Sequence, residues 1–502
     1  MNLATDDAAS GRGKWMALAA AILGWLFDGL EMGLFPLIAR PALQDLLGTT
    51  EDARIGLWIS VMTAGFLVGA ATGGVLFGWL GDRIGRVRAM MLSVLTYALF
   101  TGLCGIAGSA EQVFVYRFIA ALGMGGEWSL GVSLVMEIWP NRSRGWLAGL
   151  IGAAANVGFM LIAIVSLVLM QVIGSLESGL LAVGLPEAWV TSLVANSGWR
   201  LLLIFGAAPA LLTFLIRLFV PESERWLHER SAGATSHWAA RDLLGVLIGG
   251  IGPLLMMYLW AVKHPLELRI AGSLFGLGLT VVGYLYPVVR YLQRSGAASA
   301  ALAGQWRQPL WRMLLGASLS GVALLGTWGS LQWAPAWADQ LTQGREPNAK
   351  AYMQLAAGSG AILGTIAAAL VGNWIGRRVT YALLCLLSLG SALLLFRGNT
   401  AFDAMFLFSV FLAGGCTASF YGWLPLYLPE LFATRLRATG QGFAFNFGRI
   451  LAAMGALQTG YLMNDVFAGS YPQACSVMSL IYLVGFVIIW FAPETHGQPL
   501  PD

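Results

Sequence analysis

The chain has 502 residues, of which 58% are hydrophobic and only 11% are charged, with a net charge of +4. Soluble domains carry about 25% charged residues, and a chain with a mean hydropathy of +0.72 could not cover a water-exposed surface. A soluble enzyme, a disordered protein and a secreted disulfide scaffold are thereby excluded. The apolar runs are long and continuous, without the period-two alternation of barrel strands, so we expect an all-α polytopic membrane protein.

Apolar runs long enough to span a bilayer core of about 30 Å recur along the chain. The first six are 15–37, 56–80, 89–108, 113–139, 147–172 and 201–220. After a polar stretch come 243–262 and 270–292. The last six are 311–333, 351–371, 381–396, 405–428, 443–463 and 477–491. The sequence therefore predicts about 14 transmembrane helices.

Arginines gather in the loops on one side of these predicted helices. They are Arg83, Arg86, Arg88, Arg142, Arg144, Arg225, Arg230, Arg241, Arg290, Arg294, Arg307, Arg377, Arg378, Arg435 and Arg437, together with Arg12 and Lys14. Positive residues remain on the cytoplasmic side of a membrane. We therefore expect a multi-pass protein of the plasma membrane, in bacteria the inner membrane, with both termini in the cytoplasm.

Several short patterns occur twice at similar positions in the two parts of the chain. Residues 78–86 return as 371–378, Glu137 returns as Glu430, and 221–223 return as 493–495. Two parallel repeats are typical of secondary transporters. We predict two six-helix bundles, at 1–235 and 301–502, with a transmembrane helix pair inserted between them at 236–300.

Residues 78–88, with the sequence GWLGDRIGRVR, resemble the hallmark loop between the second and third helices of the major facilitator superfamily. Residues 117–128 and 137–145 are similar to the branch of that superfamily that contains sugar and organic-acid symporters. The resemblance covers nearly the whole chain. It implies two bundles that rock around a site in the middle of the membrane.

Within that branch, residues 24–31 (GWLFDGLE) most resemble the sialate:proton symporters. Members of that family carry two extra helices between the halves, which the run from 243 to 292 fits. The aromatic-acid:proton symporters have an Asp-Gly-x-Asp motif in the first helix, but this chain has Glu31 at the last position. Residues 493–497 resemble the ending of sugar porters.

Two acids lie in the middle of the first predicted helix. Asp28 and Glu31 are three residues apart and share a face, and an isolated charge at such a depth costs about 2.5–3.5 kcal/mol on insertion scales. Arg117 and Glu127 lie in the fourth predicted helix, and a cavity like that of the family places Arg117 opposite Asp28. Because burial favours a neutral acid and a cation favours an ionised one, a change of partner would act as a proton switch. We interpret these four residues as proton-coupling residues; the alternatives are a static ion pair, or acids satisfied by helix ends or water.

Arg449 and Asn446 are the polar exception in the second half. A guanidinium binds a carboxylate through two parallel hydrogen bonds, so Arg449 suits an anionic substrate; the alternative is a side chain that reaches to the inner interface. Asn156 and Trp128 are further candidates for substrate binding. The intramembrane charges do not recur between the halves, which indicates coupling or substrate chemistry for them and a scaffold or gate role for the residues that do recur.

A third set of charged and polar residues lies at the predicted cytoplasmic ends of helices. We interpret them as an inner gate that forms when the transporter faces outward; the alternative is that they only determine topology. They are Asp82, Arg83, Arg86, Glu137, Arg144, Asn373, Arg377, Glu430 and Arg437.

The sequence thus predicts a secondary active transporter that carries a small organic anion with protons by alternating access. Sialic acid, another sugar acid or a monocarboxylate is the expected substrate. Alternatives are a proton-coupled transporter of a neutral sugar or polyol, or a membrane sensor on the same fold. No Walker loop, nucleotide motif or His/Cys metal cluster is visible in the sequence, so we expect no enzyme activity, cofactor, metal or nucleic acid. The expected partners are the small-molecule substrate, protons and the lipid bilayer, and we expect a monomer.

Overall fold

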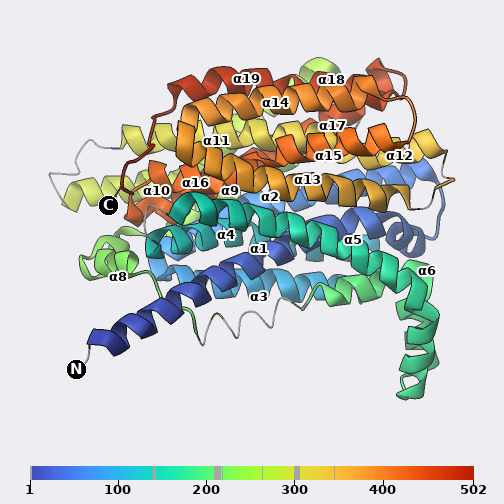
Figure 1. Ribbon diagram of the computed structural model, residues 1–502, viewed down its shortest axis with the longest axis horizontal. Coiled ribbons are helices and arrows are strands. Elements are labelled where there is room, and N and C mark those ends of the chain that lie inside the picture. The colour runs from blue at the N-terminus through green and yellow to red at the C-terminus, as the bar shows by residue number, and fades with distance from the viewer. Residues whose placement is uncertain are drawn as a thin grey trace.

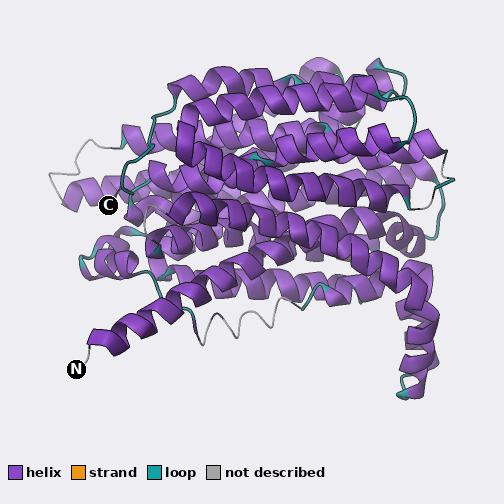
Figure 2. Ribbon diagram, viewed as in Figure 1, coloured by secondary structure: helices purple, strands orange, loops and turns teal. Residues whose placement is uncertain are grey.

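The computed structural model describes residues 3–139, 143–208, 216, 219–262, 264–298, 306–343, 345–346 and 348–501. Long helices lie side by side along the longest axis of the molecule (Figure 1). Every regular element in those ranges is a helix, and none is a strand (Figure 2). The all-α fold expected from the composition is therefore confirmed.

The first helices are long and follow the predicted apolar runs. They are α1 (Leu3–Leu47), α2 (Asp52–Ile84), α3 (Arg86–Cys104), α4 (Ala110–Ile138), α5 (Arg144–Ala182) and α6 (Glu187–Phe205). The two parts of α6, Glu187–Asn196 and Gly198–Phe205, meet at an angle of 89°. The predicted run 201–220 lies partly outside the described residues, as does Arg142.

The remaining helices alternate between long spans and short segments. They are α8 (Glu224–Ser231), α9 (Leu243–Ala261), α10 (Leu266–Ala298), α11 (Arg307–Gly329), α12 (Ala334–Thr342), α13 (Ala349–Ile375), α14 (Arg377–Gly398), α15 (Ala404–Ala418), α16 (Phe420–Tyr427), α17 (Arg437–Tyr461), α18 (Tyr471–Ser479) and α19 (Ile481–Ile488). Short 3₁₀ turns η6 (Leu428–Leu431) and η7 (Thr434–Leu436) connect α16 to α17.

Twelve helices in the described ranges are long and apolar enough to cross a membrane, or thirteen if the bent pair in α6 is one span. This agrees roughly with the expected number of about 14. α17 is absent from the twelve, although it is long enough, because Gln441, Asn446 and Arg449 lower its hydropathy. Its polar residues are buried in protein rather than exposed to lipid, so a hydropathy criterion undercounts it.

Two helix pairs join the first part of the bundle to the second. α2 packs along α17, and α5 packs along α13. The α2–α17 contact is so close that a Cβ atom at Gly442 would lie 2.2 Å from the carbonyl oxygen of Gly74. Small residues permit such contact between membrane helices.

The helices α9 and α10 pack mainly on each other and touch α2 and α17. The hydroxyl groups of Thr72 on α2 and Tyr284 on α10 lie 2.7 Å apart and share a hydrogen bond. Much of the outer surface of α9 is exposed leucine and isoleucine, as expected of a lipid-facing pair. The division of the chain at 235 and 300 stays a prediction.

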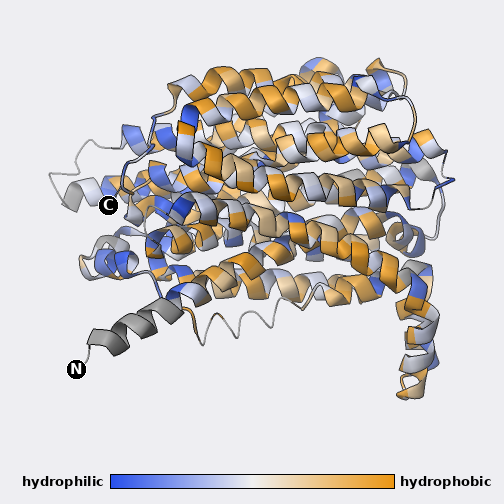
Figure 3. Cartoon of the chain, viewed as in Figure 1, coloured by the Kyte–Doolittle hydropathy of each residue, from blue (hydrophilic) through white to orange (hydrophobic). Residues whose placement is uncertain are grey.

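Hydrophobic residues cover the middle of the helices, and hydrophilic residues gather at the two ends of the bundle (Figure 3). The ends marked N and C lie at the same end of the bundle as α8 (Figure 1). We call this the arginine-rich end, defined by Arg86, Arg377 and Arg437. Each of these three arginines begins a helix there.

Candidate functional site

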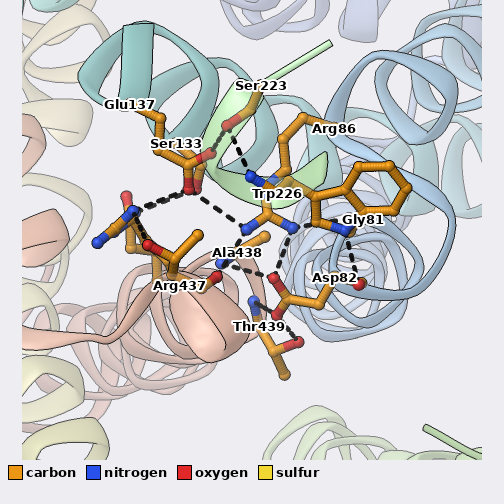
Figure 4. A network of polar contacts seen from close by, with 12 residues as sticks. Gly81, Asp82, Arg86, Ser133, Glu137, Ser223, Trp226, Arg437, Ala438 and Thr439 are labelled. Carbon is orange, nitrogen blue, oxygen red and sulfur yellow. Dashed lines mark hydrogen bonds and ion pairs between the residues drawn. The ribbon is translucent and has the colours of Figure 1, made fainter. Parts of the chain in front are cut away.

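Asp82, near the end of α2, caps the first turn of α17 across the two parts of the bundle (Figure 4). The backbone N–H groups of Ala438 and Thr439 donate to its carboxylate over N–O distances of 3.3 and 2.8 Å. The Thr439 hydroxyl donates to the same carboxylate at 2.5 Å. The first N–H groups of a helix lack internal partners and carry partial positive charge, so a carboxylate is favoured there.

Arg86, the first residue of α3, is fully buried and links the Asp82 cap to α4. Its guanidinium makes ion pairs with Asp82 at 2.7 Å and with Glu137, near the end of α4, at 3.3 Å. It also donates to the carbonyl oxygens of Gly81 at 2.7 Å and Thr434 at 2.8 Å. A buried cation needs such pairing, because an unpaired one would carry a large desolvation penalty.

Glu137 connects this group to the second part of the chain. Its carboxylate accepts an ion pair from Arg437, the first residue of α17, at 2.9 Å. The Ser223 hydroxyl donates to its other oxygen. Arg437 also donates to the backbone oxygen of Pro501 at 2.6 Å, so the C-terminal segment is part of the same network.

The same construction recurs at the start of α14. Arg377 binds Glu430 through two hydrogen bonds of 2.9 and 2.7 Å. It donates to the carbonyl of Gly372, five residues earlier, as Arg86 does to Gly81. The Thr495 hydroxyl donates to Glu430 at 2.6 Å, in the place that Ser223 takes beside Glu137. We call these two copies together the end network.

Two further acids bind the helix starts from outside. Glu222 accepts from the backbone N–H groups of Arg86 at 2.9 Å and Val87 at 3.1 Å. Glu494 accepts from those of Arg377 at 3.0 Å and Arg378 at 3.1 Å. Burial would raise the pKa of Glu494, but these N–H donors outweigh it and hold that pKa below its ordinary value. For Glu222, burial prevails and raises the pKa.

A second group of buried charges lies within α1, α4 and α17. We call it the mid-bundle cluster: Asp28, Glu31, Arg117, Glu127 and Arg449, each at most 5% exposed. Arg117 makes an ion pair with Glu31 at 3.0 Å. Its guanidinium also lies over the ring of Phe35, with 4.2 Å between the guanidinium carbon and the ring centroid, a favourable cation–π position.

This pairing corrects the expectation that Arg117 faces Asp28. α1 and α4 run antiparallel, because Glu31 lies against Arg117 whereas the earlier Gly24 lies against the later Glu127. A residue one turn earlier in α1 therefore faces a later turn of α4. Asp28, one turn after Gly24, consequently lies on the side of Glu127, and the charges of the two carboxyl groups act on each other.

Arg449 enters the cluster from α17, on the other side of the bundle. Its charge acts on Asp28, and its guanidinium donates to the side-chain oxygen of Asn446 at 2.7 Å. Asn446 in turn donates to the carbonyl of Gly125 on α4 at 3.0 Å. Arg449 therefore does not reach to an interface: it is held by Asn446, and the bond of Asn446 to Gly125 spans the two parts of the chain.

An aromatic contact closes the space beside these charges. The rings of Trp128 on α4 and Phe445 on α17 are stacked, with centroids 3.9 Å apart and planes 8° apart. The Arg449 guanidinium lies 5.3 Å from the centroid of the Phe445 ring. Asn156 is half-buried on α5, and its side chain donates to the carbonyl of Gly152 in its own helix at 3.0 Å.

Comparisons with known proteins agree with this architecture. Residues 43–245 match the family described as sugar (and other) transporter. A putative metabolite transport protein of Haemophilus influenzae is 24% identical over 97% of this chain and 98% of its own. The cis,cis-muconate transport protein of Acinetobacter baylyi is 25% identical over 96% and 95%. The sialic acid transporter NanX of Escherichia coli is 29% identical, over 43% of this chain and 45% of its own.

Solved structures share the fold. The proton:xylose symporter XylE, of the major facilitator superfamily, covers 98% of both chains with a TM-score of 0.70 at 18% identity. The human organic anion transporter MFSD10 covers 95% of this chain and 99% of its own with a TM-score of 0.64 at 16% identity. The chain has the fold of the major facilitator superfamily and is similar to transport proteins over nearly its whole length. Its helices make it a multi-pass membrane protein.

Six of the nine predicted gate residues belong to the end network. Asp82, Arg86, Glu137 and Arg437 form one connected copy of the end network, and Arg377 with Glu430 forms the other. Three predicted residues stand apart from both copies: Arg83, Asn373 and Arg144. Arg83 is exposed, with its guanidinium over the Trp79 ring, and Asn373 is exposed. Arg144 is buried and has no ion pair with any described residue, although Glu430 acts on its charge.

The sequence interpretation missed several residues of the transporter's sites. Glu222, Ser223, Glu494 and Thr495 belong to the end network. Their signal was visible, since 221–223 and 493–495 recur, but it was used only to define the repeat. Phe445 gave no signal, because a phenylalanine in an apolar helix is ordinary.

Proposed function

We propose that this transporter couples the movement of a small organic carboxylate to that of protons. The observation that carries the proposal is the position of Arg449. Arg449 is a buried cation that is held by Asn446. The charge of Arg449 acts on Asp28 across the two parts of the bundle. A guanidinium between the two parts can bind a carboxylate through two hydrogen bonds, and the acids of α1 and α4 beside it can take up protons.

The names of relatives support a carboxylate. Relatives similar over nearly the full chain are named for cis,cis-muconate, niacin and 4-methylmuconolactone. All three names are of carboxylic acids, since a muconolactone keeps one free carboxyl group, and NanX, which matches less than half of the chain, is named for another. A carboxylate substrate would give the buried Arg449 an anionic partner, which a neutral sugar would not.

We also propose the mode of action. The bundles 1–235 and 301–502 rock against each other around the mid-bundle cluster, while the inserted pair 236–300 packs against their outer side. The arginine-rich end faces the cytoplasm of a plasma membrane, the bacterial inner membrane, with both termini there. The formed end network then corresponds to a state closed toward the cytoplasm. The protein acts as a monomer.

Uptake by the purified transporter in liposomes tests this function. Radiolabelled nicotinate, cis,cis-muconate, sialic acid and xylose are each offered with the outside more acidic than the inside. We expect at least one of the three carboxylates to accumulate above its outside concentration and to lose that accumulation when a protonophore is added. Accumulation of xylose without any of the acids would contradict the anion assignment, and accumulation that survives the protonophore would contradict the coupling to protons.

A further inference from the structure

Most of the carboxyl oxygens of Asp28 and Glu127 lack a hydrogen-bond donor among the described residues. One oxygen of Asp28 and both oxygens of Glu127 are buried without a partner among the described residues. Glu31, by contrast, is paired with Arg117 at 3.0 Å. The Glu127 carboxyl lies against Gly24, one turn before Asp28, and its charge acts on Asp28. One proton shared by the two carboxyl groups would supply the missing donor, whereas two ionised carboxylates side by side would repel each other.

Gly24 makes room for this contact. It lies one helical turn before Asp28 on α1, and a Cβ atom there would lie 1.8 Å from the Oε1 atom of Glu127. Any side chain at position 24 would therefore push the Glu127 carboxyl away. The clash is with the tip of a flexible side chain, so such a change displaces the carboxyl without disturbing the helices.

The charges that surround the pair determine how many protons it holds. Glu31 on α1 and Arg117 on α4 neutralise each other, which leaves Arg449 on α17 as the one cation of the cluster without an acid partner within ion-pair distance. Tyr97 on α3 faces the pair as a neutral hydroxyl. Tyr421 on α16 lies near Arg449, and the thiol of Cys104 on α3 lies near the Arg117–Glu31 pair. One proton on the pair leaves it with a charge of −1, which balances Arg449.

We propose that Asp28 and Glu127 form a carboxyl pair that holds one shared proton at rest and takes up a second, the coupling proton, when a substrate carboxylate binds Arg449. This deepens the proposed function and rests on it for the role of Arg449. The substrate carboxylate adds one negative charge to a neutral cluster, and the second proton removes it. An uncompensated charge at this depth would cost about 2.5–3.5 kcal/mol, so each carboxylate group is carried with one proton and without net charge. Glu31 stays ionised throughout, and Gly24 is a positioning residue.

Infrared spectroscopy of the purified full-length transporter tests the pair without requiring transport. A protonated carboxylic acid has a carbonyl stretch that is separate from the carboxylate bands. We expect this band in the substrate-free wild type at neutral pH. It should shift or disappear in Asp28→Asn and in Glu127→Gln, because a shared proton belongs to both groups, and stay in Glu31→Gln. A band that is unchanged in Glu127→Gln, or that is lost in Glu31→Gln, would overturn the pair.

Gly24→Ala adds a test that leaves all five charges in place. We expect it to shift the same band, since the new methyl group separates Glu127 from Asp28. The matched control is Gly131→Ala on α4, one turn after Glu127, where a Cβ atom would meet its nearest neighbour, Ala21, at 3.6 Å, an ordinary contact. The control should keep the wild-type band. Equal spectra for the two alanine variants would contradict the positioning role of Gly24.

The transport of a carboxylate and the shared proton can be tested separately. If no carboxylate accumulates in liposomes but the band responds as expected, the proposed function fails and the shared proton stands. If carboxylates accumulate with protons but the band is unaffected by Asp28→Asn and Glu127→Gln, the function stands and the pair fails. A membrane potential imposed without a pH gradient should drive no accumulation of a monocarboxylate; accumulation under that condition would overturn the one-to-one ratio.

Discussion

The end network is built twice in this chain, whereas the mid-bundle cluster is built once. Arg86 with Glu137 and Glu222 has its counterpart in Arg377 with Glu430 and Glu494, down to the main-chain atoms that each side chain binds. The mid-bundle cluster draws four of its five charges from α1 and α4 and one from α17. A network that is built twice suits a gate to which both parts of the chain contribute in the same way. A cluster that is built once suits a binding site in which the two parts have different roles.

The two copies of the end network also differ where the bundle parts meet. Asp82 caps α17 through three hydrogen bonds. Asn373 stands at the matching position beside the start of α5, where a Cβ atom at Gly145 would lie 2.9 Å from its own Cβ atom, yet Asn373 is exposed. Arg437 is paired across the bundle with Glu137, while Arg144 has no such pair with Glu430. The α2–α17 contact is therefore the tighter seam of the closed end.

The largest effect should follow from removing the charge of Glu137, the acid that pairs with both Arg86 and Arg437. Glu137→Gln leaves Arg86 and Arg437 buried with an incomplete partner, a change that costs about 3 kcal/mol or more, or about a hundredfold in the closed-to-open ratio. A cysteine at buried Ser133, introduced into a variant without the four native cysteines, should then react at least that much faster with a thiol reagent added at the arginine-rich end.

The matched control for that experiment is the exposed Glu224→Gln on α8, which should leave the labelling rate unchanged. Equal rates for Glu137→Gln and the control would reduce the end network to a determinant of topology.

A smaller effect is expected at the mid-bundle cluster. Arg449→Lys keeps the charge but loses the planar pair of donors, so the apparent affinity for a transported carboxylate should fall about tenfold, the equivalent of one charge-assisted hydrogen bond. Arg397→Lys, on the exposed end of α14, serves as the control. An unchanged affinity in Arg449→Lys, measured by substrate exchange in liposomes, would remove Arg449 from the binding site.

The smallest effect should come from making the α5–α13 contact at Asn373 like the α2–α17 contact at Asp82. Asn373→Asp places a carboxylate beside the first turn of α5, which is worth about 1 kcal/mol at a helix start, and should slow labelling of the cysteine at position 133 about fivefold. Asp82→Asn should speed it. Faster labelling in Asn373→Asp would show that the α5–α13 contact is not weakened by the absence of a charge at position 373.

Hydropathy and repeats predicted the fold because both are properties of residue types along the chain. The apolar runs predicted the helices, and α17 shows why a count from hydropathy alone falls short: a helix buried among others can carry Gln441, Asn446 and Arg449. The charges of the mid-bundle cluster could also be found in the sequence, because each interrupts an apolar run.

The pairing of those charges could not be predicted in the same way. It depends on the antiparallel register of α1 and α4, which places Glu31 rather than Asp28 against Arg117 and brings Glu127 to Asp28. Register is fixed by close contacts such as Gly24 against Glu127, and a sequence alone does not show which glycine meets which acid. The cap of α17 by Asp82 likewise joins residues more than 350 positions apart.

We propose that proton coupling resides in the singly built cluster, in the pair formed by Asp28 and Glu127. Uptake of a transported carboxylate into liposomes, driven by a pH gradient of one unit, tests it in the wild type and in Asp28→Asn. The account predicts about tenfold accumulation in the wild type, since one proton per anion transmits about 1.4 kcal/mol. In the variant it predicts only equilibration, with substrate exchange retained. Accumulation by Asp28→Asn to the wild-type level would contradict the account.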